Sequence, residues 1–260
     1  MSLQVWLPLT GDLHNQGLSN LSFTNTNATV NNNGKIGQCY SFDGTAYLRA
    51  NNFTLSTTTW SLATWIYPTK ASTSAHQWIL NVNESSAANF LGGLCYYQNK
   101  FGIRLKDTTY LSDSTSVTDK WYHVAITYDG NLATDTLKIY INGLKVKAFN
   151  KNAIETPYNA TKISIGARVG EAGFFEGKLN DVRIYDHALS SKEVEEISKG
   201  LILHYKLDDR TNQTGTNLLT AALAATTSGW SKWVNSGATS PTMSYVTVDG
   251  YKCVLTTYPT

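Results

Sequence analysis

The sequence predicts an all-β protein: an antiparallel sandwich of two sheets, closed by one short helix and followed by a partial second β module. Runs of alternating apolar residues recur every ten to fifteen positions and are separated by clusters of Gly, Asn and Asp. Alternation with a period of two is typical of half-buried strands. Asn142-Gly143 links two of these runs directly, and only residues 188–199 have a clear helical pattern.

The strands follow from these alternating runs. Asn142-Gly143 accepts the two positive φ values of a type I′ turn, so its flanking runs are expected to form a tight hairpin. Asp43-Gly44 and Asp129-Gly130 are weaker turn signals of the same kind. The expected strands are Leu3–Leu9, Gln38–Phe42, Ala46–Arg49, Trp60–Tyr67, Gln77–Val82, Phe90–Tyr97, Phe101–Lys106, Tyr122–Tyr128, Leu137–Ile141, Leu144–Phe149, Lys162–Ile165 and Gly177–Tyr185.

Two of these strands are apolar on both faces. In 60–67, Trp60, Leu62 and Ile66 point one way, whereas Trp65 and Tyr67 point the other way. The run 122–128 repeats this pattern. We therefore expect both to be central strands, with one face in the core and the other in a concavity or under a loop.

The helix is expected over Ala188–Lys199, and it ends the sandwich. Ser190 and Glu193 have the spacing of a capping box, and Gly200 suits the position just after the last turn. Leu201–Asp209 then echoes Leu3–Asp12, which indicates an internal repeat. We therefore expect a sandwich over residues 1–199 and the truncated start of a second β module over residues 200–260.

Composition excludes several classes of protein. The formal net charge is +2, from 21 basic and 19 acidic residues, which predicts no nucleic-acid partner. No apolar run approaches the roughly 18 residues of a membrane span, so no membrane insertion is expected. Met1 leads straight into the first strand without the basic start of a signal peptide. Cys39, Cys95 and Cys253 lack the spacing of a metal cluster and are expected to be buried thiols.

Five segments, taken in order, resemble the laminin G-like domains of the concanavalin A-like family. The resemblance implies a jelly-roll sandwich that binds rather than catalyses. Two positions depart from the family pattern: His187 stands where Arg is usual, and Asn180 where Asp is frequent. The segments are Phe42–Leu48 (FDGTAYL), Trp60–Pro68 (WSLATWIYP), Trp121–Asp129 (WYHVAITYD), Leu137–Gly143 (LKIYING) and Phe175–Ser190 (FEGKLNDVRIYDHALS).

A hydrolase on this architecture would need paired carboxylates on one strand, in the spacing Glu-x-Asp-x-Glu. The sequence has no such spacing, because Glu84, Glu155, Glu171 and Glu176 are scattered over expected loops. The nucleophile elbow Gly-x-Ser-x-Gly and the phosphate-binding glycine loop are also missing. The chain is therefore not expected to be an enzyme.

The functional hypothesis for the aromatic residues is that they contact a carbohydrate. Sugar rings stack on aromatic side chains, and neutral amides and hydroxyls bind their hydroxyl groups. The alternative for each aromatic residue is packing. The candidates are Trp65 and Tyr67 on the second strand face, Tyr96 and Tyr97 near a loop, and Phe174 and Phe175 after Gly173.

The resemblance also implies a structural calcium ion, held between the N-terminal segment, the turn after the second strand and the final strand. The matching positions are Asp12, Asp43 with Gly44, and Asp181. Calcium takes six to eight hard oxygen ligands, backbone carbonyls included. The alternative is that these aspartates form turns and caps.

Together these observations predict a non-catalytic carbohydrate-binding or adhesion module. The neutral surface rich in Asn, Ser and Thr, the missing signal peptide and the restart after Gly200 indicate a bacteriophage virion protein, such as a tail-fibre, receptor-binding or capsid-decoration component. The expected partners are cell-surface glycans or polysaccharides and other virion or surface proteins, and the expected location is the virion or the cell surface. Two alternatives stay open: a structural spacer that docks on a protein, and an accessory domain of a larger polysaccharide hydrolase.

Overall fold

The computed structural model describes residues 2–53, 55, 58–83, 92–105, 108–151, 161–168, 172–200, 242–248 and 251–257. The chain divides into two compact units, Met1–Leu203 and His204–Thr260. In the second unit the structure describes one antiparallel hairpin, β16 (Thr242–Val248) with β17 (Tyr251–Thr257). The echo over 201–209 lies outside the described residues, so the domain division at residues 199 and 200 stays a prediction.

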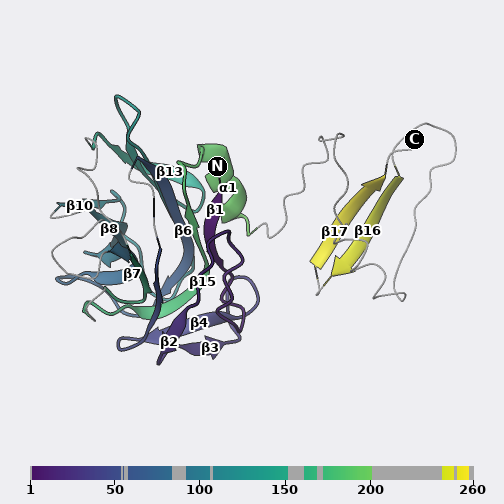
Figure 1. Cartoon of the computed structure of the whole chain (residues 1–260), viewed down its shortest axis with the longest axis horizontal. Helices are drawn as coiled ribbons and strands as arrows, with labels where there is room; N and C mark the ends of the chain where they lie inside the picture. The colour runs from purple at the N-terminus through teal and green to yellow at the C-terminus, as the bar shows by residue number, and fades with distance from the viewer. Residues whose placement is uncertain are drawn as a thin grey trace. The chain divides into compact units, whose positions relative to one another are not determined.

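The first unit is a sandwich of two antiparallel sheets (Figure 1), as the sequence predicts. The first sheet has the order β13-β12-β11-β6-β15-β4-β3, with β1 paired to β15. Its strands are β1 (Leu3–Leu7), β3 (Thr29–Asn31), β4 (Cys39–Asp43), β6 (Thr59–Pro68), β11 (Tyr122–Asp129), β12 (Leu137–Ile141), β13 (Leu144–Phe149) and β15 (Glu176–Tyr185).

The second sheet has the order β10-β9-β8-β7-β14-β5-β2. Three strands that the sequence analysis missed, β2, β3 and β10, lie at the ends of the two sheets, where short and polar strands show little apolar alternation. The strands of this sheet are β2 (Thr24–Thr26), β5 (Tyr47–Asn51), β7 (Gln77–Asn83), β8 (Gly92–Tyr97), β9 (Lys100–Leu105), β10 (Thr108–Leu111) and β14 (Lys162–Ile165).

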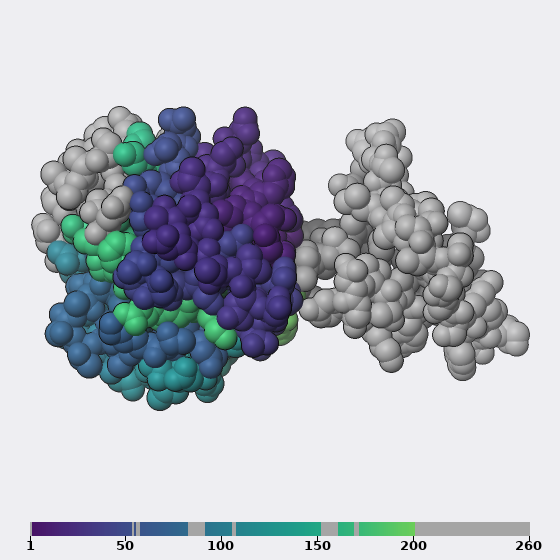
Figure 2. Space-filling view, turned by 90° about the horizontal axis from the view of Figure 1, so that it is seen from below, coloured from purple at the N-terminus to yellow at the C-terminus, as the bar shows by residue number. Residues whose placement is uncertain are grey.

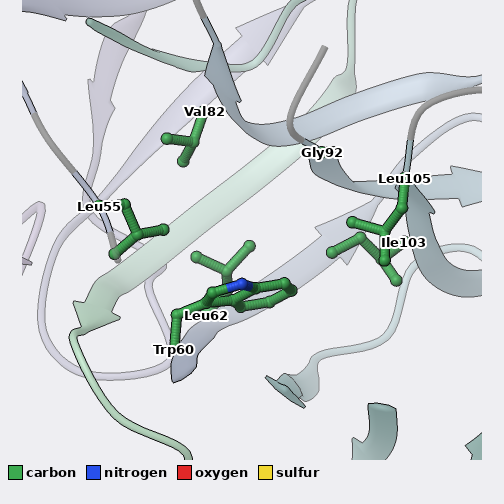
Figure 3. Close-up of a pocket in the computed structure, with 7 residues that line it drawn as sticks. All are labelled: Leu55, Trp60, Leu62, Val82, Gly92, Ile103 and Leu105. Carbon is green, nitrogen blue, oxygen red and sulfur yellow. The ribbon is translucent and has the colours of Figure 1, made fainter. Parts of the chain in front are cut away.

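One hydrophobic core fills the space between the sheets, as the alternation in β6 predicts. Trp60, Leu62 and Ile66 point into it and are buried. The residual apolar cavity around Trp60 (Figure 3) measures about 10 Å³, which is no more than one water molecule needs. Cys39 and Cys95 are buried free thiols, as predicted, whereas the side chain of Cys253 lies outside the described part of the chain. Among the described residues, the cavity around Trp60 between the sheets is too small for a ligand.

The helix α1 (Ser191–Ser198) begins three residues later than expected, because Ser190 is its N-cap. The Ser190 side chain accepts the Glu193 N–H, and the Glu193 carboxylate accepts the Ser190 N–H, which completes the predicted capping box. Val194 packs with Tyr140 and Tyr185 on the outer face of the first sheet. Among the described residues, no helix has the length and apolar character that crossing a membrane requires.

Trp65 lies on this same outer face, but it is covered. Its ring meets the His123 ring edge-on at 5.3 Å, and the Lys35 ammonium lies 4.8 Å from the ring centre. Only 6% of Trp65 and 1% of His123 are exposed. Burial, with a smaller effect from the Arg183 charge, lowers the pKa of His123 to about 3. The prediction that Trp65 contacts a ligand is therefore wrong, because neighbouring side chains occupy its surface.

Replacing Ser190 with alanine is expected to lower the free energy of unfolding by about 1 kcal/mol, because the first turn loses a side-chain acceptor. Urea unfolding measures this change. Lys192→Ala, an exposed substitution in the same turn, is the control and is expected to change stability by less than about 0.5 kcal/mol. Equal losses in both variants would contradict the capping role.

Acid is expected to destabilise the domain through His123. Below the ordinary histidine pKa of about 6.5 the unfolded chain takes up a proton that the folded protein does not bind, so stability falls by about 1.4 kcal/mol per pH unit until the folded-state pKa is reached. Urea unfolding at pH 6.5 and pH 4.5 should show a flatter pH dependence for His123→Gln than for the unmodified chain. The exposed His14→Gln is the control; a slope unchanged in His123→Gln would overturn the assignment.

Candidate functional site

The predicted aromatic candidates separate into buried and surface residues. Tyr96 and Phe175 have no exposed surface and belong to the core. The Tyr96 hydroxyl donates to the Ser116 carbonyl at 3.2 Å. The prediction of ligand contact is wrong for both, because Tyr96 turns inward from β8 and Phe175 packs into the core just before β15, while Tyr97 and Phe174 stay half-buried at the surface.

Tyr67 is half-buried on the outer face of the first sheet. Its ring centre lies 5.4 Å from that of Trp121, and the Lys178 ammonium lies 4.9 Å from its ring. Trp121 was not among the predicted ligand residues, because it precedes β11 and is not part of an alternating apolar run. Tyr67 and Trp121 form a small aromatic patch on the surface. Neither residue lines any of the described pockets.

A hollow of about 270 Å³ lies instead between the loop that precedes β7 and the start of β15. We name it the edge pocket, and it is lined by residues 70–77 together with Gly173, Phe174 and Glu176. Of the predicted ligand residues it contains Phe174. Its other lining residues escaped the sequence analysis because they belong to a polar loop without periodicity.

Hydrogen bonds hold the loop of the edge pocket in place. The Gln77 side chain donates to the carbonyls of Lys70 and Ala71 and accepts the Glu176 N–H at 3.1 Å. The Ser72 hydroxyl donates to the carbonyls of Ala75 and Tyr96. Gln77 and Ser72 are themselves buried, so the loop is tied to both sheets. The pocket is therefore formed before any ligand arrives.

His76 and Phe174 are the aromatic residues in the described lining of the edge pocket, and His76 is held by rings behind it. The His76 ring stacks on Tyr97, with centres 4.0 Å apart, and on Trp78, with centres 5.5 Å apart. Burial, with a contribution from Arg104, lowers the pKa of His76, which favours the neutral ring at pH 7. Gly173 has φ +61°, and a Cβ there would lie 2.5 Å from the Trp78 ring, so this close approach requires glycine.

The charges in the edge pocket offset each other. Lys70 forms an ion pair with Glu176, and the described lining otherwise carries hydroxyls, alanines, the Gln77 amide and the rings of His76 and Phe174. Such a lining suits a neutral ligand that has both hydroxyl groups and an apolar face. Of the other acidic residues considered for catalysis, Glu84, Glu155 and Glu171 lie outside the described residues.

The predicted calcium ligands have other partners. The side chains of Asp12 and Asp43 are exposed and accept backbone N–H groups two residues ahead, from His14 and Thr45. Gly44 has φ +87° and forms the turn after Asp43. Asp181 is paired with Arg183 at 2.9 Å. Within the described ranges no three Asp, Glu, His or Cys side chains could share a metal ion, so these residues do not fit the predicted calcium site.

Comparison with known proteins agrees with the fold. No curated protein matches the chain. Domain 4 of AbnA, a GH43 extracellular arabinanase from Geobacillus stearothermophilus whose structure holds arabinotriose, is 18% identical; the match covers 76% of this chain and 98% of that one, with a TM-score of 0.60.

Two further structures match only part of longer chains. The receptor binding domain of botulinum neurotoxin C/D mosaic serotype is 18% identical, with a TM-score of 0.59 over 78% of this chain and 52% of that one. Trypanosoma rangeli sialidase is 12% identical, with a TM-score of 0.59 over 77% of this chain and 33% of that one. Residues 42–195 match the family model described as the concanavalin A-like lectin/glucanases superfamily. The chain therefore belongs to this superfamily.

Proposed function

We propose that the domain is a non-catalytic carbohydrate-binding module and that the edge pocket is its binding site. The observation that carries the proposal is a preformed, electrically balanced hollow lined by the rings of His76 and Phe174. Phe174 and His76 line the pocket and offer apolar ring surface to a sugar, while the hydroxyls of the 70–77 loop offer partners for its hydroxyl groups. A neutral oligosaccharide or polysaccharide end is the ligand class that fits.

The wider setting is a cell-surface or virion role, in which the module attaches a bacteriophage component such as a tail fibre, receptor-binding protein or capsid decoration to a surface glycan. The neutral surface rich in Asn, Ser and Thr supports this setting. A second candidate, an accessory domain of a polysaccharide hydrolase, is favoured by the likeness to a single domain of an extracellular arabinanase. A protein-docking role is favoured by the likeness to a neurotoxin binding domain solved with rat synaptotagmin II.

Binding to an array of glycans and bacterial envelope polysaccharides tests the proposal. The purified chain is expected to bind a subset of neutral glycans, and Phe174→Ala is expected to weaken that binding tenfold or more, because the sugar loses about 1.4 kcal/mol of contact. His76→Ala should act in the same direction. Tyr67→Ala is the matched control, since it removes an equally half-buried aromatic ring outside the pocket.

Each pattern of results has a defined meaning. Loss in Phe174→Ala with retention in Tyr67→Ala supports the edge pocket as the site. The reverse pattern would move the site to the patch of Tyr67 and Trp121. No binding by a folded sample on the whole array would overturn the carbohydrate proposal and favour the docking role.

Calcium is expected to leave the stability of the domain unchanged, because the predicted acidic residues are engaged in turns and in the Asp181–Arg183 pair. Thermal unfolding in excess EDTA and in millimolar calcium chloride measures this. The same melting temperature in both conditions is the expected result. An increase of several degrees with calcium would show that backbone oxygens complete a site, and it would restore the calcium prediction.

A further inference from the structure

A second hollow, of about 170 Å³, opens beside the pairing of β1 with β15 and shares no lining residue with the edge pocket. We name it the β1 pocket. The N-terminal residues that form much of its wall belong to the purple segment that spreads over the face shown in Figure 2. Its lining residues are Trp6, Pro8, Thr10, Gln16, Ile36 and Asp181.

Asp181 reaches this pocket because β15 contains a bulge. The register of β15 against β6 shifts between Asn180 and Arg183, and Asp181 has φ +55°. A bulge re-aims side chains away from the regular alternation, and such features occur often beside functional sites. Asn180 holds Pro8 and Ile36, two lining residues of the pocket, in place. Its amide donates to the Pro8 carbonyl at 2.7 Å and accepts the Ile36 N–H at 2.7 Å.

Only one of the two carboxylate oxygens of Asp181 accepts hydrogen bonds within the protein. Its Oδ1 accepts both the Trp6 Nε1–H at 2.7 Å and the Arg183 Nε–H at 2.9 Å. Its Oδ2 is buried and has no hydrogen-bond partner in the protein, and the same is true of the Arg183 Nη2 group. An arginine fork commonly pairs both of its nitrogens with both carboxylate oxygens, but here the second bond is not made.

A buried acceptor and a buried donor without partners are costly, and native structures usually satisfy them. A hydroxyl group in the β1 pocket can donate to the Asp181 carboxylate, because Asp181 lines the pocket. Charged groups fit less well: Asp181 would repel a carboxylate or phosphate, and Arg183 would repel an ammonium group. The chemistry of this position therefore selects a neutral hydroxyl.

We propose that the β1 pocket binds one neutral sugar ring, with a ring hydroxyl donating to Asp181 Oδ2 and the ring lying against Trp6. The pocket is smaller than the roughly 300–1,000 Å³ that hold drug-sized ligands, so a single ring fits better than a chain. Exposed Thr10 and Gln16 form the rim and can move aside to admit it. This site is separate from the proposed edge-pocket function and can be present without it.

Ligand-observed NMR on the full chain tests the proposal with free glucose, galactose, arabinose and N-acetylglucosamine, beside glucuronate and glucosamine as charged counterparts. At least one neutral sugar is expected to show saturable binding, and the charged counterparts none. Gln16→Trp, which fills the pocket from its exposed rim, should weaken binding tenfold or more. Leu18→Trp is the matched control, because Leu18 is 75% exposed in the same loop and does not line the pocket.

Asp181→Asn should abolish binding as well, because an amide cannot accept at both of its terminal atoms; if this variant does not fold, the pair of tryptophan variants decides. The same measurements in the Phe174→Ala background, in which the edge pocket is impaired, separate the two sites: neutral-sugar binding that remains there and is lost on adding Gln16→Trp belongs to the β1 pocket. Absence of neutral-sugar binding would overturn the proposal and leave a bound water as the partner of Oδ2. Equal binding by Gln16→Trp and Leu18→Trp would overturn it too.

Discussion

The hydrogen bonds of Asn180 are the constraint on which much of the first unit depends. This residue is fully buried in the middle of β15, the strand that pairs with β6, β4 and β1. Its amide donates to the carbonyls of Pro8 and Gln38 and accepts the Ile36 N–H, so it ties two N-terminal loops to the sheet. An aspartate, which is frequent at this position in the family, could not donate both bonds. The departure from the family pattern is thus part of how this chain orders its N-terminal loops.

Both pockets lie at irregular points of the chain in or next to β15. The edge pocket lies at the start of β15, just after Gly173 passes close to Trp78, and the β1 pocket adjoins the bulge of β15 at Asp181. In both places the regular part of the strand is held by the core, while the irregular part presents side chains outward. A rigid scaffold with functional groups at its irregular points needs little reorganisation to bind a ligand, which reduces the entropy cost of association.

The sequence was sufficient for the sandwich and insufficient for the site, for the same physical reason. Alternation in β6 and β11 identified the core faces because every second side chain points into the core between the sheets. Adjacent aromatic pairs carry no such information: Tyr96 is buried beside half-buried Tyr97, and Phe175 beside half-buried Phe174, and only the folded backbone decides which member turns inward. His76 and Gln77 were missed because their roles come from tertiary hydrogen bonds and ring stacking that join distant segments.

Charge neutralisation links the two pockets. Glu176 is paired with Lys70 and Asp181 with Arg183, so neither pocket presents a net charge through these residues. The pair of Lys70 and Glu176 is partly exposed, so it contributes little to the stability of the fold. Because its two charges neutralise each other, it offers no net attraction to a charged ligand. The second pair is almost fully buried, and removal of either partner would leave an uncompensated charge. The proposed selection for neutral ligands would therefore come from a solvated pair in one pocket and from a buried pair in the other, and only the second is also tied to folding.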